Sequence, residues 1–325
     1  MKSSSFPLIG WLLFIGVWIY LPYWVSAFKL LLYIEILIMA LLATSFNLLF
    51  GYTGLLSFGQ AAYFGIGAYV CGLMLMKISS SFWLAILVGV IFATLSAFAI
   101  GFFCVRLTGI YFSMLTLAFG QMVYAIAFKW YDVTGGDNGL VGVPKPTVSF
   151  FGLISLDLAS PLYYYYFVLV FFILSTFLLW KIVHSPLGYI LRGIRENLER
   201  VNFSGLEVKK FQLIAFSIAG CFAGLAGALY APFASTVSPD VVGWTKSAEP
   251  VLMTLLGGSE VFLGPILGSW LFLLLKDYII SHTDFWEIYF GVTLVFLVIF
   301  LPGGVMGFLR TLWSRIARGG RRIGV

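Results

Sequence analysis

The stretch GYTGLLSFGQAAYFGIGAYVCG, residues 51–72, has the length and apolar character of a membrane-spanning helix but carries six glycines. About 20 apolar residues are what an α-helix needs to cross roughly 30 Å of hydrocarbon. Glycine weakens a helix interior, and a helix broken at membrane depth persists only where protein or a water-lined cavity satisfies its freed backbone groups. The stretch therefore predicts an interrupted span within a larger helical membrane protein.

The composition of the whole chain supports this interpretation. Of its 325 residues, 61% are hydrophobic, 18% are aromatic and 10% are charged, and the mean hydropathy is +1.04. These values exclude an ordinary soluble domain. We expect an all-α, polytopic transmembrane helical bundle of about nine to ten spans, including a broken or re-entrant helix. The apolar runs predicted to span are residues 6–24, 30–50, 55–76, 82–105, 109–128, 162–183, 211–231, 266–280 and 285–301.

A second interrupted run, SAEPVLMTLLGGSEVFLGPILGS, occupies residues 247–269. Interrupted spans in both halves of a membrane protein can mark a central pathway. The alternative is that the glycines only let helices pack closely. Both interpretations stay open from the sequence. The candidate pathway-lining residues are Ser57, Gln60, Gly65, Gly67, Gly257, Gly258, Ser259 and Glu260.

Basic residues predict the orientation, because they favour the cytoplasmic side when they lie near span ends. They gather in residues 184–210 and in the tail 302–325, whereas the loop 129–161 is balanced or acidic. We therefore expect one transmembrane domain, residues 1–325, with both termini inside the cell and the loop 129–161 outside. An even number of crossings then requires one more short or re-entrant segment, which we place at residues 248–256. The first run follows one lysine and resembles a signal peptide, but its length favours a first span.

Eight charges lie between Arg192 and Lys210, in an otherwise apolar chain. A charge at the bilayer centre costs about 2.5–3.5 kcal/mol on insertion scales, so these residues must face water or protein. Charges of both signs favour a protein partner, since a lipid-binding segment would carry mainly Lys and Arg. A helix lying on the headgroups is the alternative.

The same segment has the pattern of an amphipathic helix. Ser185 and Pro186 suit a helix start, apolar residues recur with helical spacing, and Gly205 is placed to end the helix. Glu196 and Arg200 have the spacing of a favourable i,i+4 pair. We therefore predict one helix from about residue 185 to 205.

No catalytic or metal-binding centre stands out. His184 and His282 have no metal-ligand or nucleophile–base spacing with other candidates. The cysteines Cys71, Cys104 and Cys221 lie inside apolar runs and predict small buried side chains without disulfides. The motif GxxxxGK[ST] is absent from the sequence, so ATP would have to be bound by another polypeptide.

Glu35 is a carboxylate near the start of an apolar run. An ionisable residue there is a functional candidate, here as an ion-coupling site. Its position near the predicted outer end also allows its side chain to reach the interface. Ion-coupled carriers usually have several such groups deep in their spans, and the apparent scarcity of these groups counts against a secondary transporter.

The loop 129–161 contains the turn-forming sequence TGGDNG, residues 134–139. It is either a contact surface for an extracytoplasmic partner or a solvated connection. In the first case Asp137 and Asn138 are the candidate contacts with a binding protein.

The sequence resembles the M-type permease subunit of the branched-chain amino-acid ABC importers. The resemblance covers most of the chain, from about residue 47 to 307. The segments that carry it are GYTGLLSFGQAAYFGIGAY, TGIYFSMLTLAFGQM, TGGDNGL, LRGIRENLERVNFSGLEVKKFQLIAFSIAGCFAGLAGALYAP and EPVLMTLLGGSEVFLGPILG.

The resemblance implies a non-enzymatic subunit of the inner or plasma membrane of a bacterium or archaeon. It implies that a second homologous permease, two ATP-binding subunits and an extracytoplasmic substrate-binding protein are its partners, in membrane lipid and without nucleic acid. ATP and Mg would be bound by the ATPase subunits, with no cofactor in this chain. Leu, Ile and Val are the expected cargo; a urea or short-amide importer is the alternative, ahead of a secondary transporter or channel. Residues 184–210 would carry the coupling helix, with Arg192, Arg195, Glu196, Asn197, Glu199, Arg200 and Gly205 contacting the ATPase.

Overall fold

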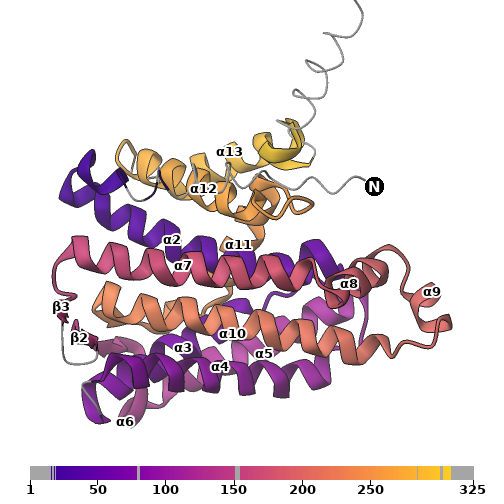
Figure 1. Cartoon of the computed structure of the whole chain (residues 1–325), viewed down its shortest axis with the longest axis horizontal. Coiled ribbons are helices and arrows are strands. Elements are labelled where there is room, and N and C mark those ends of the chain that lie inside the picture. Colours follow the sequence, from indigo (N-terminus) through magenta and orange to yellow (C-terminus); the bar gives the residue numbers. More distant parts are fainter. Residues whose placement is uncertain are drawn as a thin grey trace, which may run out of the picture.

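The computed structural model describes residues 16, 18, 20–78, 81–150, 154–283, 285–300 and 303–308. Within these residues long helices lie side by side in a bundle (Figure 1). One end of the bundle carries α8 and α9, and the opposite end carries β2 and β3, so we refer to the α8–α9 end and the β2–β3 end. The long helices are α2 (Ala27–Asn47), α3 (Gln60–Leu73), α4 (Phe82–Cys104), α5 (Gly109–Lys129), α7 (Pro161–Val183) and α10 (Val208–Ala234).

The helices of the described residues agree with a polytopic membrane protein. With their π-helical extensions, the six helices above are long and apolar enough to cross a membrane. Three further apolar helices follow: α11 (Trp244–Gly257), α12 (Gly264–Ile280) and α13 (Trp286–Phe300), of 14, 17 and 15 residues. The predicted short segment 248–256 is the second part of α11. Most of the predicted first span, 6–24, and most of the tail lie outside the described residues.

The interrupted span is present, and its geometry differs from the predicted run 55–76. Helix α2 continues as a π-helix, η2 (Leu48–Thr53), and ends at Gly54, whose φ of +78° favours glycine. The next five residues are not helical, and α3 begins only at Gln60. The first part of that predicted span was therefore wrong. A second π-helix, η3 (Met74–Ile78), extends α3 toward the β2–β3 end.

Side chains of α5 satisfy the freed backbone groups of this non-helical segment. The Thr116 hydroxyl accepts from the Phe58 N–H at 3.1 Å, and the Ser113 hydroxyl donates to the Leu56 carbonyl at 2.7 Å. A Cβ on Gly59 would lie 2.8 Å from the Thr116 carbonyl, so only glycine lets the segment approach α5 this closely. Irregular backbone at membrane depth is tolerated where protein buries it in this way.

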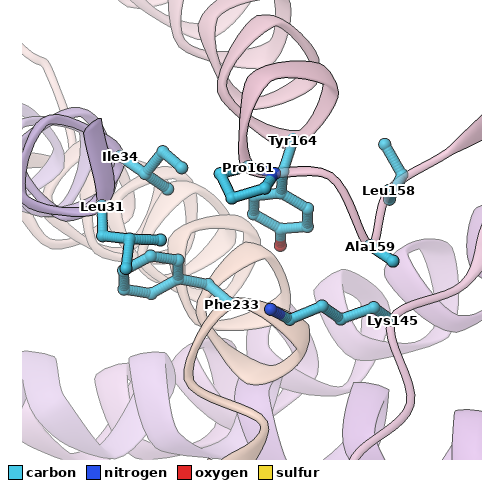
Figure 2. Close-up of a pocket in the computed structure, with 8 residues that line it drawn as sticks. All are labelled: Leu31, Ile34, Lys145, Leu158, Ala159, Pro161, Tyr164 and Phe233. Atoms are coloured by element: carbon cyan, nitrogen blue, oxygen red, sulfur yellow. The ribbon is translucent and has the colours of Figure 1, made fainter. Parts of the chain in front are cut away.

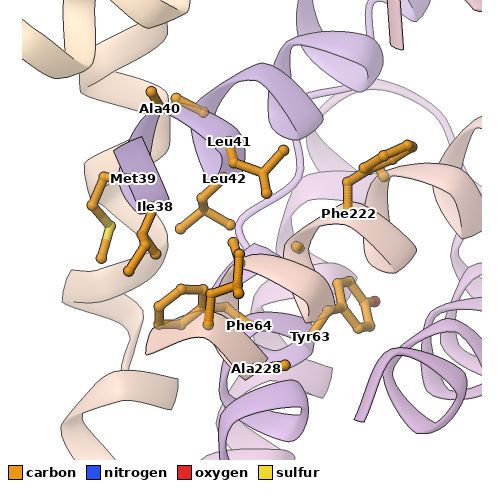
Figure 3. Close-up of a cluster of buried hydrophobic side chains, with 14 of the residues drawn as sticks. Ile38, Met39, Ala40, Leu41, Leu42, Tyr63, Phe64, Phe222 and Ala228 are labelled. Carbon is orange, nitrogen blue, oxygen red and sulfur yellow. The ribbon is translucent and has the colours of Figure 1, made fainter. Parts of the chain in front are cut away.

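Small residues set how closely α3 packs on its neighbours. A Cβ on Gly67 would lie 2.1 Å from the Gly224 carbonyl, and one on Gly65 would lie 2.3 Å from Val242 Cγ2. Close packing at these two glycines is thus confirmed, as expected where helices in a membrane associate through small residues. Figure 3 shows Ile38–Leu42 of α2 beside Tyr63 and Phe64 of α3, with side chains of α10 completing the core.

The segments between the long helices are ordered at the β2–β3 end. The loop after α5 forms α6 (Tyr131–Thr134) and the 3-10 turn η4 (Gly136–Asn138). Strand β1 (Leu140–Val141) pairs antiparallel with β4 (Thr236–Val237), and β2 (Thr147–Phe150) pairs with β3 (Ile154–Asp157). After β4 the 3-10 turn η5 (Pro239–Val242) packs on α3 through Val242 and leads into α11.

Candidate functional site: the α8–α9 end and its contact with α2

The charged segment forms two helices, α8 (Pro186–Glu196) and α9 (Leu198–Phe203), separated by extended backbone at Asn197 (φ −159°, ψ 99°). The Asn197 side chain accepts from the Arg200 N–H at 2.9 Å and so caps α9. Asparagine is among the best N-cap residues and a poor residue for a helix interior, which explains the break. The prediction of one continuous helix, with an i,i+4 pair of Glu196 and Arg200, was wrong.

The turn from α7 into α8 is tight. Ser185 occupies the N-cap position with extended backbone, but its hydroxyl donates to the Ile182 carbonyl at 2.7 Å instead of capping α8. A Cβ on Gly188 would lie 2.1 Å from the Val183 carbonyl, so glycine is required where α8 folds back on α7. This geometry fixes the direction in which α8 leaves the bundle.

Helix α8 is amphipathic in the way the sequence predicts. Gly188, Leu191 and Ile194 are buried against the bundle. The opposite face of α8 and most of α9 are exposed, including the aromatic residues Tyr189 (61%) and Phe203 (89%). Of the predicted ATPase contacts, Arg195, Glu196, Asn197, Glu199, Arg200 and Gly205 are exposed and Arg192 is half-buried. The exposed charges suit a protein-facing surface; their role in docking stays a prediction.

Helix α8 is attached to the interrupted end of α2, the segment Leu48–Gly54, which we call the seat. The Arg195 guanidinium donates through Nη1 to the Gly51 carbonyl. The Arg192 guanidinium lies 5.0 Å from the ring centre of Tyr52, within the range of a cation–π contact. The carbonyls near a helix end lack intrahelical partners, so the arginine supplies the donor that the end of α2 needs.

The seat also touches the turn between α11 and α12. A Cβ on Gly51 of the seat would lie 2.4 Å from the Ser259 carbonyl of this turn. The turn also packs on the residues that follow α13, since a Cβ on Gly258 would lie 2.4 Å from the Gly303 carbonyl. Backbone therefore meets backbone directly at both contacts. The seat therefore contacts both α8 and the α11–α12 turn.

The candidate pathway residues fall into three places. Ser57 and Gln60 are fully buried at the start of α3, where Ser247 of α11 accepts from the next backbone N–H, that of Ala61, at 3.2 Å. Gly65 and Gly67 lie in the helix contacts described above. Gly257 and Gly258 are buried at the α11–α12 turn, Ser259 is half-buried and Glu260 is exposed. Whether these residues line a pathway stays a prediction.

At the β2–β3 end, Asp137 and Asn138 are exposed on η4, as a contact with a binding protein would require. A small depression at the same end is lined mostly by apolar residues of α2, α7, α10 and the loop 129–161. Figure 2 shows the Lys145 side chain extending into it beside Phe233.

Sequence reasoning missed one group of ionisable residues, Lys246, Glu249 and Lys276, which we call the ionic cluster. Lys246 Nζ lies 2.6 Å from Glu249 Oε2, and Lys276 Nζ lies 3.3 Å from Glu249 Oε1. The sequence did contain one indication of this cluster, because the carboxylate of Glu249 lies inside the predicted short segment 248–256. Lys276 is 27 residues away in sequence, however, and only the α11–α12 turn brings it to Glu249. Ionisable groups in apolar helices are thus less scarce than the sequence suggested.

The described residues contain no group of three or more His, Cys, Asp or Glu that could hold a metal ion. The cysteines Cys71, Cys104 and Cys221 are unbridged, and the first two are buried in the core.

A family model described as "Branched-chain amino acid transport system / permease component" matches residues 29–301. The chain belongs to this family. It is therefore a permease component of a transport system and a multi-pass integral membrane protein of the inner membrane.

Known relatives agree with this assignment. The permease is 28% identical to the high-affinity branched-chain amino acid transport system permease protein LivM of Escherichia coli K12, over 84% of this chain and 69% of that protein. It is 23% identical to a probable branched-chain amino acid transport permease protein LivM of Methanocaldococcus jannaschii, over 82% of this chain and 89% of that protein. A shorter match, 28% over 30% of each chain, is to the autoinducer 2 import system permease protein LsrC of Escherichia coli O157:H7. No solved structure matches the permease.

Proposed function

We propose that this permease is the membrane-spanning subunit of an ATP-driven importer that moves Leu, Ile and Val, delivered by an extracytoplasmic binding protein. The observation that carries the proposal is the contact of α8 with the seat. An exposed, charged helix pair at one end of the bundle is fastened by Arg195 to an interrupted span that reaches into the bundle.

The mechanism follows from this connection. ATP and Mg are bound by two separate ATPase subunits, which dock on the exposed face of α8–α9 from the cytoplasm. Closure of the ATPase dimer displaces α8, and the seat and the α11–α12 turn move with it. This permease and a second, homologous one then rock between outward-open and inward-open states. The binding protein docks at the β2–β3 end, where Asp137 and Asn138 are exposed.

The substrate assignment rests on the relatives. The two LivM proteins are named for branched-chain amino acids and cover most of the chain, whereas LsrC, named for autoinducer 2, covers 30% of it. A urea or short-amide importer is the alternative cargo for the same architecture.

Uptake of radiolabelled leucine and urea tests the proposal, in cells that express the partner chains with and without this permease. We expect ATP-dependent leucine uptake only when the permease is present. Loss of urea uptake alone would keep the architecture and change the cargo. No effect on either substrate would contradict the proposal.

A further inference from the structure

The first turns of α3 and α11 meet at the residue that begins α3, Gln60. The Ser247 hydroxyl, in the first turn of α11, accepts from the Ala61 N–H in the first turn of α3 at 3.2 Å. The Ser57 hydroxyl accepts from the Gly59 N–H at 3.3 Å. Two serine hydroxyls thus bind the N–H groups on either side of Gln60 in the chain, and we call Ser57, Gln60 and Ser247 the α3–α11 site.

The side chains of the α3–α11 site are enclosed but not fully paired. Ser57, Gln60 and Ser247 are 0%, 0% and 1% exposed. Neither carboxamide atom of Gln60 has a hydrogen-bond partner among the described residues. A serine hydroxyl that accepts an N–H still has its own proton to donate. Buried polar groups are nearly always hydrogen-bonded, so an unpaired carboxamide in a membrane-spanning helix indicates a partner from outside the helix bundle.

The groups of this site suit an anion. The Gln60 carboxamide and the hydroxyls of Ser57 and Ser247 can all donate hydrogen bonds. The N-terminus of a helix carries a partial positive charge, and here the first turns of two helices meet. Interrupted helices of transporters bind anionic substrate groups at such N-termini within the membrane. The anionic group that Leu, Ile and Val share is their α-carboxylate.

The site is closed in this structure, and α3 contacts its two neighbours in different ways. Helix α3 packs on α10 backbone to backbone, since a Cβ on Gly67 would lie 2.1 Å from the Gly224 carbonyl. Between the first turns of α3 and α11 the contact is the hydrogen bond of Ala61 to the Ser247 hydroxyl. Water or a substrate can replace such a bond at little net cost in free energy.

We propose that Ser57, Gln60 and Ser247 form a binding site for the α-carboxylate of the amino-acid substrate, which becomes accessible when the first turn of α11 separates from α3. The inference rests on the proposed function and deepens it. The Gln60 carboxamide and the two hydroxyls donate to the carboxylate, and the two helix N-termini add favourable partial charge. When α11 returns, the Ser247 hydroxyl binds the Ala61 N–H again and the site closes.

The competing explanation is that these side chains only stabilise the start of α3. The two explanations differ in what Gln60→Met does, because methionine has nearly the volume of glutamine without its polar atoms. Replacing an unpaired, buried carboxamide by such an apolar side chain should not destabilise the fold. A structural role therefore predicts normal transport for this variant, whereas a binding site predicts loss of transport in a stable protein.

The first test uses the whole transporter in proteoliposomes, with its binding protein, ATP and radiolabelled leucine. We expect Gln60→Met to keep the thermal stability of wild type and ATPase stimulation within about twofold, and to lose about tenfold of its leucine flux. Gln212→Met, the same change at a buried glutamine of α10, is the matched control with unchanged flux. Wild-type flux in Gln60→Met would overturn the site.

Labelling of introduced cysteines tests the opening and covers the case in which Gln60→Met fails to assemble. It uses the transporter with Cys71, Cys104 and Cys221 replaced by alanine. We expect Ser247→Cys to react with a charged, membrane-impermeant methanethiosulfonate at least about fivefold faster in one nucleotide state than in another, and leucine to slow this reaction. Ser269→Cys should react in no state, because Ser269 is equally buried and bonds within its own helix.

The outcomes separate the site from the proposed function. A Ser247→Cys variant that is unreactive in every nucleotide state would overturn the site. Reaction that depends on nucleotide but is not slowed by leucine would overturn the assignment of the carboxylate. If the wild-type transporter moves no leucine, the proposed function itself fails, whatever the labelling shows.

Discussion

The charges at the α8–α9 end and the charges of the ionic cluster are of the same residue types in very different surroundings. Glu207 and Lys210 form a pair whose side chains are 66% and 70% exposed, whereas the side chains of Glu249 and Lys246 are 16% and 15% exposed. Exposed charges keep most of their hydration, so they cost almost no folding free energy, and they suit a surface that meets another protein. Partly buried charges are costly to desolvate unless they are paired, and each oxygen of Glu249 lies within 4 Å of a lysine ammonium.

A substitution at the α11–α12 turn should have the largest effect, because this turn joins the two helices of the ionic cluster and touches the seat. A Cβ on Gly257 would lie 1.8 Å from the Gly264 carbonyl, so Gly257→Val forces α11 and α12 apart. We expect a destabilisation of several kcal/mol, about 3 or more, and loss of folded transporter. The yield of monodisperse complex after purification measures this.

Gly193→Ala on α8 is its control, because the new Cβ meets only a Val201 methyl at 3.3 Å. We expect a normal yield for this variant. A normal yield for Gly257→Val would show that the turn is not the rigid link between the two regions.

A smaller effect is expected from releasing α8 from the seat. Arg195→Ala removes the donor to the Gly51 carbonyl and leaves the exposed charges of α9 in place. We expect leucine transport and stimulated ATPase activity to fall together by about tenfold, because nucleotide-driven motion no longer reaches α2. Arg195→Lys should recover only part of the loss, since one ammonium cannot reproduce the geometry of the guanidinium.

The exposed Lys209, at the same end of the bundle, offers the control. Lys209→Ala should leave both activities unchanged. An Arg195→Ala variant with normal activities would show that α8 acts without this contact.

The sequence predicted the uninterrupted helices well and the interrupted regions less well. Helix α4 was expected at 82–105 and α7 at 162–183, and the structure has Phe82–Cys104 and Pro161–Val183. Their boundaries follow from local polarity and turn-forming residues. Leu55–Gly59 is equally apolar but not helical, because hydroxyls of α5 more than 50 residues away bind its backbone. The local sequence pattern does not reveal hydrogen-bond partners that are so far away in the sequence.

The same limit applies to the candidate site. The amphipathic character of α8 was predicted from periodicity, whereas the break at Asn197 required weighing its capping strength against helix continuity. The contact of Arg195 with Gly51 joins positions 144 residues apart, and the sequence assigned this arginine only to an external partner. The residues were thus predictable, and their contacts were not.

A smaller, local effect is expected at the break between α8 and α9, where Asn197 caps α9. Asn197→Ala removes the cap that accepts from the Arg200 N–H and should destabilise α9 by about 1 kcal/mol. This corresponds to roughly fivefold faster amide hydrogen exchange in α9, with α8 unaffected because it packs on the bundle. Exchange measured by mass spectrometry on the purified transporter tests this, with Asn202→Ala inside α9 as the control. Equal exchange in the two variants would show that the cap does not hold α9.

The smallest effect concerns the exposed pair of Glu207 and Lys210. Lys210→Ala should change the free energy of unfolding by less than about 0.5 kcal/mol, because both side chains are largely in water. Thermal unfolding of the purified transporter measures this at low and high salt. A clear loss of stability would mean that exposed and buried charges are not used differently in this molecule.

The most direct test of the account is the number of leucine molecules transported per ATP hydrolysed, measured in proteoliposomes for wild type, Arg195→Ala and the control Lys209→Ala. The account predicts that Arg195→Ala lowers transport and ATP hydrolysis together by about tenfold and keeps the ratio, because the contact with Gly51 passes the motion of α8 to the seat, whereas Lys209→Ala changes neither rate. Wild-type rates of both transport and ATP hydrolysis in Arg195→Ala would contradict the role of this contact.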